Sequence, residues 1–295
     1  MGINNVFVMG SGLMGAGIGQ VCAQAGMGVT LCDVSDAVLD KAMKGISWSV
    51  GKFLEKGKIA GSLNDIMGRI STATSVEKAA EADLVMEAVF EKLDVKREVF
   101  ERLGPILKED TLVATNTSAI PITELAGTIS RPERFLGLHF FSPVPMMAAV
   151  EVIRGMATSD ETFAAGRQFV VDLGKEPILV HRDVAGFVIN RINFPSAMEA
   201  MRLVEAGVTS VEDVDKGLRL AAGRRMGIFE TGDMVGLDIT YGAMMAIYQE
   251  TGDPNWYPPL LLRRKVKAGH LGRKTGRGWY EYDPDGKRLG PARNA

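Results

Sequence analysis

The stretch Val6-Phe7-Val8-Met9-Gly10-Ser11-Gly12-Leu13-Met14-Gly15 joins a short apolar run to three closely spaced glycines. A continuous apolar run of this length is typical of a strand buried on both faces of a parallel sheet. Apolar residues at helical spacing follow as far as Ala25, and a second apolar run, Val29-Thr30-Leu31-Cys32, ends at Asp33. The pattern predicts a strand, a helix and a parallel strand, with the glycines at the first turn.

The glycines have the spacing of a dinucleotide-binding turn. Gly10 permits the tight turn, Gly12 lets the backbone approach a pyrophosphate, and Gly15 lets the helix pack against the strand. The helix N-terminus offers N–H groups and a partial positive charge to the phosphates. Asp33 stands where a carboxylate accepts the ribose hydroxyls of adenosine, and Val34 rather than an arginine follows it. Because Asp33 would repel a 2′-phosphate, we expect NAD rather than NADP.

Polar residues follow two further predicted strands. The run Leu84-Val85-Met86 ends at Glu87, and the run Leu112-Val113-Ala114 leads into Thr115-Asn116-Thr117-Ser118. Ligands of open α/β sheets lie beyond the carboxyl ends of the strands. We therefore expect Glu87, Glu91 and Ser118 to face the same crevice as the glycine turn. Ser118 can hold a substrate oxygen there, or it can simply cap the helix that follows.

The stretch Gly137-Leu138-His139-Phe140-Phe141-Ser142-Pro143-Val144-Pro145 sets one histidine between an apolar strand pattern and a proline-fixed turn. A second apolar run, Ala149-Val150-Glu151-Val152-Ile153, follows. If the chain folds back at Pro145, His139 and Glu151 lie equally far from the turn and face each other. Opposed residues have Cβ atoms roughly 5 Å apart, so the carboxylate can hold an imidazole N–H. The pattern indicates either a catalytic His–Glu couple or a core histidine beside an unrelated glutamate.

The bulk properties give no sign of several classes of protein. The 295 residues suit two domains, and the net charge of −2 provides no basic surface for nucleic acid. We find neither a run of about eighteen apolar residues, as a membrane span needs, nor a secretory signal, so we expect a cytoplasmic protein. Cys22 and Cys32 fit small core positions in a reducing compartment. No His/Cys cluster has metal-ligand spacing, so we expect no metal.

A long helical pattern runs from Ser35 to Lys58. Lys52 and Lys56 are four residues apart and therefore lie on one face of this helix. Such lysines ordinarily form a solvated charged face. The alternative is a basic ledge for a phosphate-rich ligand.

The strand patterns stop after about Asp183, and Ile178-Leu179-Val180 is the last short edge strand. The sequence thus predicts a Rossmann-type α/β domain over residues 1–184, with a mostly parallel sheet and helices on both faces. An all-α domain should follow over 185–295. Its first helix should open within residues 186–192, and another should start at Asp233. Asn190 lies among apolar residues and needs a partner, either neighbouring backbone or a ligand at the domain interface.

Together these stretches resemble the L-3-hydroxyacyl-CoA dehydrogenases, and most of all the short bacterial 3-hydroxybutyryl-CoA dehydrogenases. The resemblance covers nearly the whole chain and rests on residues 10–15, 116–118, 137–145, 150–153, 186–191 and 272–276. It implies NAD as cofactor, an acyl-CoA as substrate and a homodimer formed through the helical domain. The implied reaction is reversible oxidation of an (S)-3-hydroxyacyl-CoA, of short chain, to the 3-oxoacyl-CoA. β-Oxidation of fatty acids and reductive butanoate metabolism need the same residues, so both directions stay open.

The resemblance also implies roles for individual residues. His139 would be the catalytic base, Glu151 the acid that orients it, and Ser118 and Asn190 would hold the substrate. Lys52 and Lys56 would lie near the phosphates of coenzyme A. The implied cofactor-binding residues are Gly10, Gly12, Leu13, Met14, Gly15, Asp33, Glu91, Lys96, Asn116 and Ser118.

Three positions depart from the family pattern. Ser142 stands where asparagine is usual, Ala148 where lysine or proline is frequent, and Ile228 follows Gly227 where proline is more usual. These departures bear on the preferred acyl chain rather than on the chemistry. Two other functions share the scaffold: an L-gulonate-type sugar-acid dehydrogenase related to lambda-crystallin, and a non-catalytic dinucleotide-binding protein.

Overall fold

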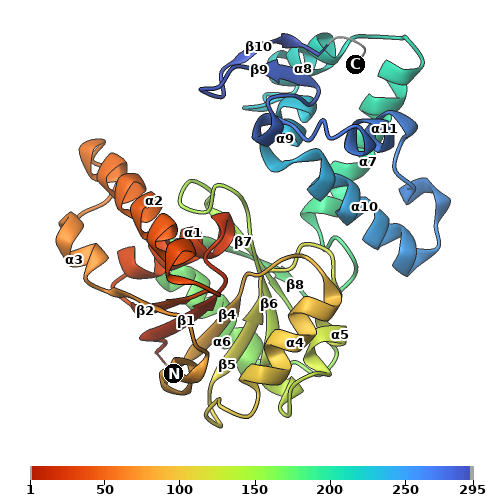
Figure 1. Cartoon of the computed structure of the whole chain (residues 1–295). Coiled ribbons are helices and arrows are strands. Elements are labelled where there is room, and N and C mark those ends of the chain that lie inside the picture. The colour runs from red at the N-terminus through yellow and green to blue at the C-terminus, as the bar shows by residue number, and fades with distance from the viewer. Residues whose placement is uncertain (1, 293–295) are drawn as a thin grey trace. The chain divides into compact units, whose positions relative to one another are not determined.

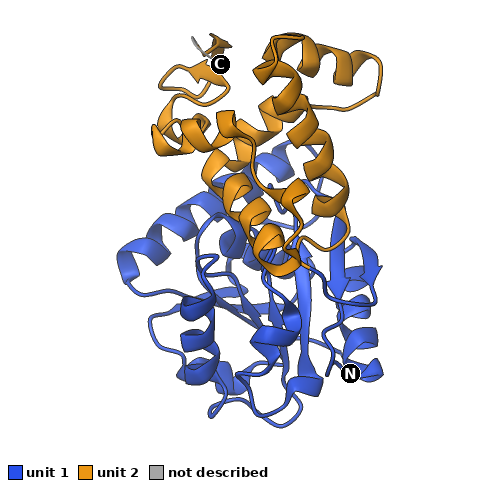
Figure 2. Ribbon diagram, turned by 90° about the vertical axis from the view of Figure 1, so that its right-hand side faces the viewer, with its two compact units in different colours: residues 1–184 blue, residues 185–295 orange. Residues whose placement is uncertain are grey.

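The apolar run at the N-terminus forms β1 (Asn5–Met9), which lies inside an eight-stranded sheet. The computed structural model describes residues 2–292. They divide into two compact units, with the boundary between Val184 and Ala185 (Figure 2). The strand order in the first unit is β3-β2-β1-β4-β5-β6-β7-β8. The strands other than β1 are β2 (Gly28–Cys32), β3 (Ile70–Ala73), β4 (Leu84–Glu87), β5 (Leu112–Thr115), β6 (Phe135–Phe140), β7 (Ala149–Ile153) and β8 (Glu176–Val180).

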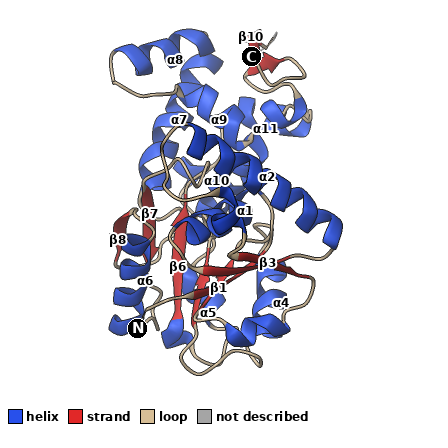
Figure 3. Cartoon of the chain, turned by 90° about the vertical axis from the view of Figure 1, so that its left-hand side faces the viewer, coloured by secondary structure: helices blue, strands red, loops and turns tan. Residues whose placement is uncertain are grey.

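The sheet is parallel from β3 to β6, and β7 pairs antiparallel with β6. β8 is the edge strand and runs parallel to β7. Helices lie on both faces of the sheet, as Figures 1 and 3 show. They are α1 (Leu13–Gln24), α2 (Asp36–Glu55), α3 (Leu63–Met67), α4 (Leu93–Leu103), α5 (Ile122–Ala126) and α6 (Asp160–Asp172), with short 3₁₀ turns at Glu77–Glu81 and Pro132–Arg134. The expected Rossmann-type architecture of this unit is confirmed.

Alternate residues of the strands serve the two faces of the sheet, because successive side chains of a strand point to opposite sides. Val8 and Met86 belong to a buried cluster that also contains Ile18 of α1 and Leu39 of α2. On the other face, Phe135 packs edge-on against Phe100 of α4, with ring centroids 4.9 Å apart. Both faces are therefore covered, as the continuous apolar strands require.

The hairpin expected around Pro145 is confirmed. The register of β6 and β7 places Gly137 opposite Ile153 and His139 opposite Glu151. Gly137 leaves room for α5, because a Cβ atom at this position would lie 2.6 Å from Cδ1 of Ile122 in that helix. His139 lies two residues further along β6 and therefore on the same face of the strand as Gly137. The close approach of α5 covers this face.

The second unit is mainly helical and has its own core, which includes Met201, Phe229, Met244 and Trp279. Its helices are α7 (Ile189–Glu205), α8 (Val211–Leu220), α9 (Ile228–Val235), α10 (Leu237–Thr251) and α11 (Leu260–Lys267), with 3₁₀ turns at Pro254–Trp256 and Arg273–Thr275. Within residues 2–292, no helix combines the length and the apolar character that crossing a membrane requires.

Two expectations for this unit are wrong in detail, and one is confirmed. Strands do occur after Asp183, because β9 (Tyr280–Tyr282) and β10 (Arg288–Pro291) form an antiparallel pair. The first helix begins at Ile189, inside the expected range of 186–192, because Gly186 and Phe187 have positive φ angles of 76° and 46° and precede the helix. No helix starts at Asp233, which lies inside α9, and Gly236, with φ 111°, separates α9 from α10.

The long helix of the first unit also ends earlier than expected. α2 stops at Glu55 instead of Lys58, and Lys56 forms its C-cap. Gly57 follows with φ 62°, a left-handed conformation that glycine adopts without the steric penalty of a Cβ atom.

Candidate active site

The glycine turn between β1 and α1 is shaped by two tight approaches and one open position. A Cβ atom on Gly10 would lie 2.6 Å from the carbonyl oxygen of Ala88, and one on Gly15 would lie 1.8 Å from that of Gly10. A Cβ atom on Gly12, the N-cap of α1, would meet nothing within 4 Å. No side chain caps the N-terminus of α1, so the first backbone N–H groups of this helix remain available as hydrogen-bond donors. This donor set fits the pyrophosphate of a dinucleotide.

Asp33 follows β2 and is tied to the glycine turn. Its Oδ2 accepts hydrogen bonds from the backbone N–H and the hydroxyl of Ser11, both at 2.7 Å. Its Oδ1 accepts one from the N–H of Val34 at 2.7 Å. The carboxylate therefore lies beside the turn, where the sequence placed it. The contribution of Ser11, which stands within the glycine motif itself, has no signal in the residue spacing.

His139 and Glu151 form a direct contact across β6 and β7. His139 Nδ1 lies 2.7 Å from Glu151 Oε2, and the two residues are 4% and 0% exposed. The Phe141 ring packs against the imidazole with centroids 4.6 Å apart. An ionised carboxylate only accepts hydrogen bonds, so Nδ1 carries the proton and Nε2 of the neutral ring carries the lone pair.

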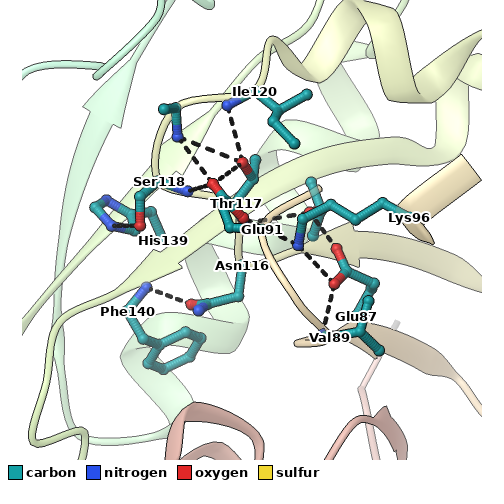
Figure 4. Close-up of polar contacts among 12 residues, drawn as sticks. Glu87, Val89, Glu91, Lys96, Asn116, Thr117, Ser118, Ile120, His139 and Phe140 are labelled. Atoms are coloured by element: carbon teal, nitrogen blue, oxygen red, sulfur yellow. Dashed lines mark hydrogen bonds and ion pairs between the residues drawn. The ribbon is translucent and has the colours of Figure 1, made fainter. Parts of the chain in front are cut away.

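Ser118 lies on the other side of the imidazole, in the loop that follows β5. Its Oγ is 3.1 Å from His139 Nε2, as Figure 4 shows. Because Nε2 is the acceptor in the neutral ring, the Ser118 hydroxyl donates this bond. The three residues thus form a chain from Glu151 through His139 to Ser118, built from three neighbouring strands of the sheet.

Glu91 holds the loop that carries Ser118. Its Oε1 accepts hydrogen bonds from the Thr117 hydroxyl at 2.6 Å, the Ser118 N–H at 2.7 Å and the Ala119 N–H at 3.2 Å (Figure 4). Partial burial raises the pKa of this carboxyl, but the Lys96 ammonium and the hydrogen bonds from Thr117 and Ser118 outweigh it and hold the pKa below its ordinary value. Glu91 is therefore ionised at neutral pH and fixes the backbone beside His139.

Lys96 lies between two carboxylates. Its Nζ is 2.7 Å from Glu87 Oε1 and 3.2 Å from Glu91 Oε2, and its side chain is 1% exposed. Burial lowers the pKa of Lys96, but the two carboxylates outweigh burial and raise it above its ordinary value. Glu87 is fully buried and also accepts the Thr115 hydroxyl at 2.6 Å and the Val89 N–H at 2.7 Å. The sequence predicts that Glu87 and Glu91 face the same crevice, but it does not predict that they share the Lys96 ammonium group.

Asn116 joins the ends of β5 and β6. Its Oδ1 accepts a hydrogen bond from the N–H of Phe140 at 2.9 Å, next to His139 (Figure 4). The residue is 9% exposed. The structure therefore brings Asn116, Ser118, Glu91 and His139 together at the carboxyl ends of neighbouring strands.

Three further predicted site residues are described separately, because no contact given above includes them. Asn190 is half-buried in the first turn of α7 and belongs to the second unit. Lys52 is exposed on α2 and pairs with Glu55 at 2.8 Å, and Lys56 is exposed at the C-cap of that helix. Among the described residues, no group of three or more His, Cys, Asp or Glu side chains is arranged to hold a metal ion.

Comparison with known proteins agrees with this geometry. Residues 5–184 match the family described as 3-hydroxyacyl-CoA dehydrogenase, NAD binding domain, and residues 186–282 match 3-hydroxyacyl-CoA dehydrogenase, C-terminal domain. The chain belongs to the 3-hydroxyacyl-CoA dehydrogenase family. It is an NAD-dependent oxidoreductase, and the resemblance found in the sequence is confirmed.

Individual relatives match over most of their length. The chain is 41% identical to a 3-hydroxybutyryl-CoA dehydrogenase of Bradyrhizobium diazoefficiens, covering 95% of this chain and 96% of that protein. It is also 41% identical to the mitochondrial hydroxyacyl-coenzyme A dehydrogenase of Homo sapiens, covering 95% and 91%. The crystal structure of (S)-3-hydroxybutyryl-CoA dehydrogenase PaaH1 from Ralstonia eutropha superposes with a TM-score of 0.89 at 41% identity, covering 96% of this chain and all of that one.

Proposed function

We propose that this protein catalyses the reversible, NAD-dependent oxidation of short-chain (S)-3-hydroxyacyl-CoA thioesters, with 3-hydroxybutyryl-CoA as the preferred substrate. The observation that carries the proposal is the chain of contacts from Glu151 through His139 to Ser118. The names of the Bradyrhizobium and Ralstonia relatives support the choice of substrate. The sugar-acid and non-catalytic alternatives have no comparable support.

His139 is the proposed general base. Its Nε2 takes the proton of the substrate 3-hydroxyl, in the place where it now accepts the Ser118 hydroxyl, while Glu151 holds Nδ1–H and balances the charge of the imidazolium. General-base help of this kind contributes on the order of 100- to 10,000-fold. Ser118, once displaced from Nε2, donates to the substrate oxygen. NAD, when bound, supplies the acceptor for the hydride that leaves C3.

The glycine turn and Asp33 are proposed to hold the adenosine and pyrophosphate parts of NAD, with Leu13 and Met14 in the first turn of α1. Glu91 and Asn116 lie at the same strand ends and are proposed to border the nicotinamide half. Lys96 is buried between Glu87 and Glu91, so we assign it to holding Glu91 in place rather than to direct contact. Asn190 for the thioester, and Lys52 and Lys56 for the coenzyme A phosphates, stay predictions.

The decisive test is steady-state kinetics with acetoacetyl-CoA and longer 3-oxoacyl-CoA esters. NADH oxidation should be fastest with acetoacetyl-CoA, and NADPH should be a much poorer cofactor because of the Asp33 carboxylate. L-Gulonate with NAD should give no comparable rate. Turnover of gulonate without turnover of acetoacetyl-CoA would replace the proposal with the sugar-acid function.

A homodimer formed through the second unit and a cytoplasmic location also stay predictions. Both follow from the sequence resemblance. Sedimentation of the purified protein tests the first, and localisation of the tagged protein in its native cell tests the second.

A further inference from the structure

Trp48 is an exposed aromatic residue that the proposed function does not yet use. It lies on α2 with 70% of its surface exposed, whereas Trp256 and Trp279 are 9% and 0% exposed. Single exposed apolar residues are common on protein surfaces and need no explanation by themselves. The residues around Trp48 decide whether its exposure has a use.

Lysines flank the indole on the same face of the helix. Residues three, four and seven positions apart are neighbours along an α-helix face. Lys44 lies four residues before Trp48, Lys52 four residues after it and Lys41 seven before it, and all three are exposed. The opposite face of α2 packs into the core through Leu39, Ala42, Ile46 and Val50, so the indole and the lysines face outward together.

The surface beside the indole is also unobstructed. Gly45 lies three residues before Trp48, and a Cβ atom at this position would meet nothing within 4 Å. Lys52 is paired only with exposed Glu55, and an exposed ion pair of this kind is weak enough to exchange for a phosphate. The face therefore offers a flat aromatic ring with ammonium groups on both sides and open backbone next to it.

We propose that Trp48 stacks against the adenine ring of the acyl-CoA substrate, while Lys41, Lys44 and Lys52 contact the phosphates of its nucleotide end. The inference rests on the proposed function, and Trp48 adds the aromatic contact to the basic ledge expected from the sequence. The ligand fits by chemistry, because the nucleotide end of coenzyme A combines one planar base with a 3′-phosphate and a diphosphate. Indole rings stack on bases of any kind, and ammonium groups bind phosphate oxygens.

The adenine of NAD does not fit this position. The ribose carboxylate proposed for NAD is Asp33, and α2 begins three residues later at Asp36. Trp48 lies 12 residues further along the helix, which places it roughly 18 Å away along the axis at about 1.5 Å per residue. An adenine attached directly to a ribose at Asp33 cannot span that distance. The nucleotide of coenzyme A is separated from the acyl group by the pantetheine arm, so it can bind far from the reacting carbon.

The test compares the whole substrate with one that lacks the nucleotide. Trp48→Ala should raise KM for acetoacetyl-CoA about 5- to 20-fold, the lower part of the range for base stacking, with the loss falling on KM rather than on kcat. Acetoacetyl-pantetheine should give the same KM in both proteins, and Trp48→Phe should recover most of the affinity. Leu220→Ala is the matched control, since Leu220 is 81% exposed on α8 of the other unit.

Fluorescence gives a second readout that does not depend on turnover. Adenosine 3′,5′-bisphosphate, added with saturating NAD, should quench the emission of the wild type and leave that of Trp48→Phe unchanged, because the other two tryptophans are buried. An unchanged KM for acetoacetyl-CoA in Trp48→Ala, or an equal rise for the pantetheine ester, overturns the proposal. An unchanged KM together with an altered sedimentation coefficient in Trp48→Ala also overturns the proposal. That result would show that Trp48 contacts another protein chain. If the wild type fails to reduce acetoacetyl-CoA, the proposed function fails, and the bisphosphate titration alone then decides the role of Trp48.

Discussion

Glu151 Oε2 lies 2.7 Å from His139 Nδ1 across the antiparallel pair of β6 and β7, and this contact makes Nε2 the basic atom of the ring. His139→Gln removes that base and keeps a side chain of similar polarity. We expect kcat for acetoacetyl-CoA reduction to fall by about 100- to 10,000-fold, while NAD binds with unchanged affinity in calorimetry, because the glycine turn and Asp33 are left intact.

His181→Gln is the matched control for this variant. His181 is exposed in the loop after β8, where its ring lies against that of Phe163. The His181→Gln variant should keep wild-type kinetics. Near-normal turnover in His139→Gln would remove the imidazole from the mechanism.

Glu151→Gln tests the orienting contact rather than the base. The amide can present either its oxygen or its NH₂ to Nδ1, so it no longer fixes the tautomer, and it carries no charge to balance an imidazolium. We expect kcat to fall by about 100-fold or more, since a hydrogen bond to a charged group contributes roughly 1.5–3 kcal/mol and the tautomer is lost in addition. The KM for NADH should change little. If Glu151→Gln and Glu151→Ala both keep full activity, the carboxylate is structural.

The His139–Glu151 pair could be predicted because both arms of the hairpin are apolar runs and the proline-fixed turn sets their register. The glycine turn could be predicted for a similar reason, since each glycine answers a local steric demand. The ion pair of Lys96 with Glu87 could not, because one residue ends a strand and the other lies on a helix, with no periodic spacing to join them.

The strands β9 and β10 escaped prediction because a distant carboxylate organises them. Asp233 of α9 accepts the backbone N–H groups of Trp279 and Tyr280 and the hydroxyl of Tyr282, at 2.8, 2.9 and 3.0 Å. Gly278 is required beside it, since a Cβ atom there would lie 2.0 Å from Asp233 Oδ1. A three-residue strand held in this way has no local hydrophobic pattern that a sequence would display.

Two glycines of the cofactor turn should respond differently to alanine. Gly12→Ala places its methyl group where the protein has no atom within 4 Å, so the melting temperature should stay within about 2 °C while the KM for NAD rises at least tenfold. Gly15→Ala forces a methyl group to within 1.8 Å of the Gly10 carbonyl oxygen, so the protein itself should be strongly destabilised. Differential scanning fluorimetry and NAD titration separate the two effects. A stable Gly12→Ala protein with normal NAD affinity would show that no pyrophosphate approaches this backbone.

The buried Lys96 ammonium offers a test of how Ser118 is positioned. Lys96→Met leaves Glu87 and Glu91 without their shared cation, and breaking a buried pair of this kind costs about 3–5 kcal/mol. We expect a lower melting temperature together with a lower kcat, because Glu91 holds the backbone of Ser118. The double variant Glu87→Gln/Lys96→Met removes the fully buried one of the two uncompensated charges and should recover part of the stability. Lys92→Met, an exposed neighbour, is the control, and equal stability of Lys96→Met and Lys92→Met would contradict the argument.

Lys265 should make the stability of the second unit depend on pH. It lies on α11 with 5% of its surface exposed, and its ammonium donates to the Gly278 carbonyl at 3.0 Å. Burial lowers the pKa of this lysine from 10.5 to about 8, although Asp233 opposes the shift. Between these values the unfolded chain binds a proton that the folded chain does not, so stability rises with pH by about 1.4 kcal/mol per unit.

The informative range is pH 8 to 10. Burial raises the pKa values of Tyr280 and Tyr282 above 10, so above pH 10 the folded chain keeps protons that the unfolded chain has lost, and stability falls with rising pH. Lys265→Met removes the lysine's contribution and keeps an unbranched apolar side chain in the same space. The free energy of unfolding of the wild type, measured against that of Lys265→Met in urea at pH 7, 8, 9 and 10, should therefore increase above pH 8 and stay flat below it. Parallel pH profiles for the two proteins would mean that the buried lysine keeps its proton through this range and that Asp233 outweighs burial.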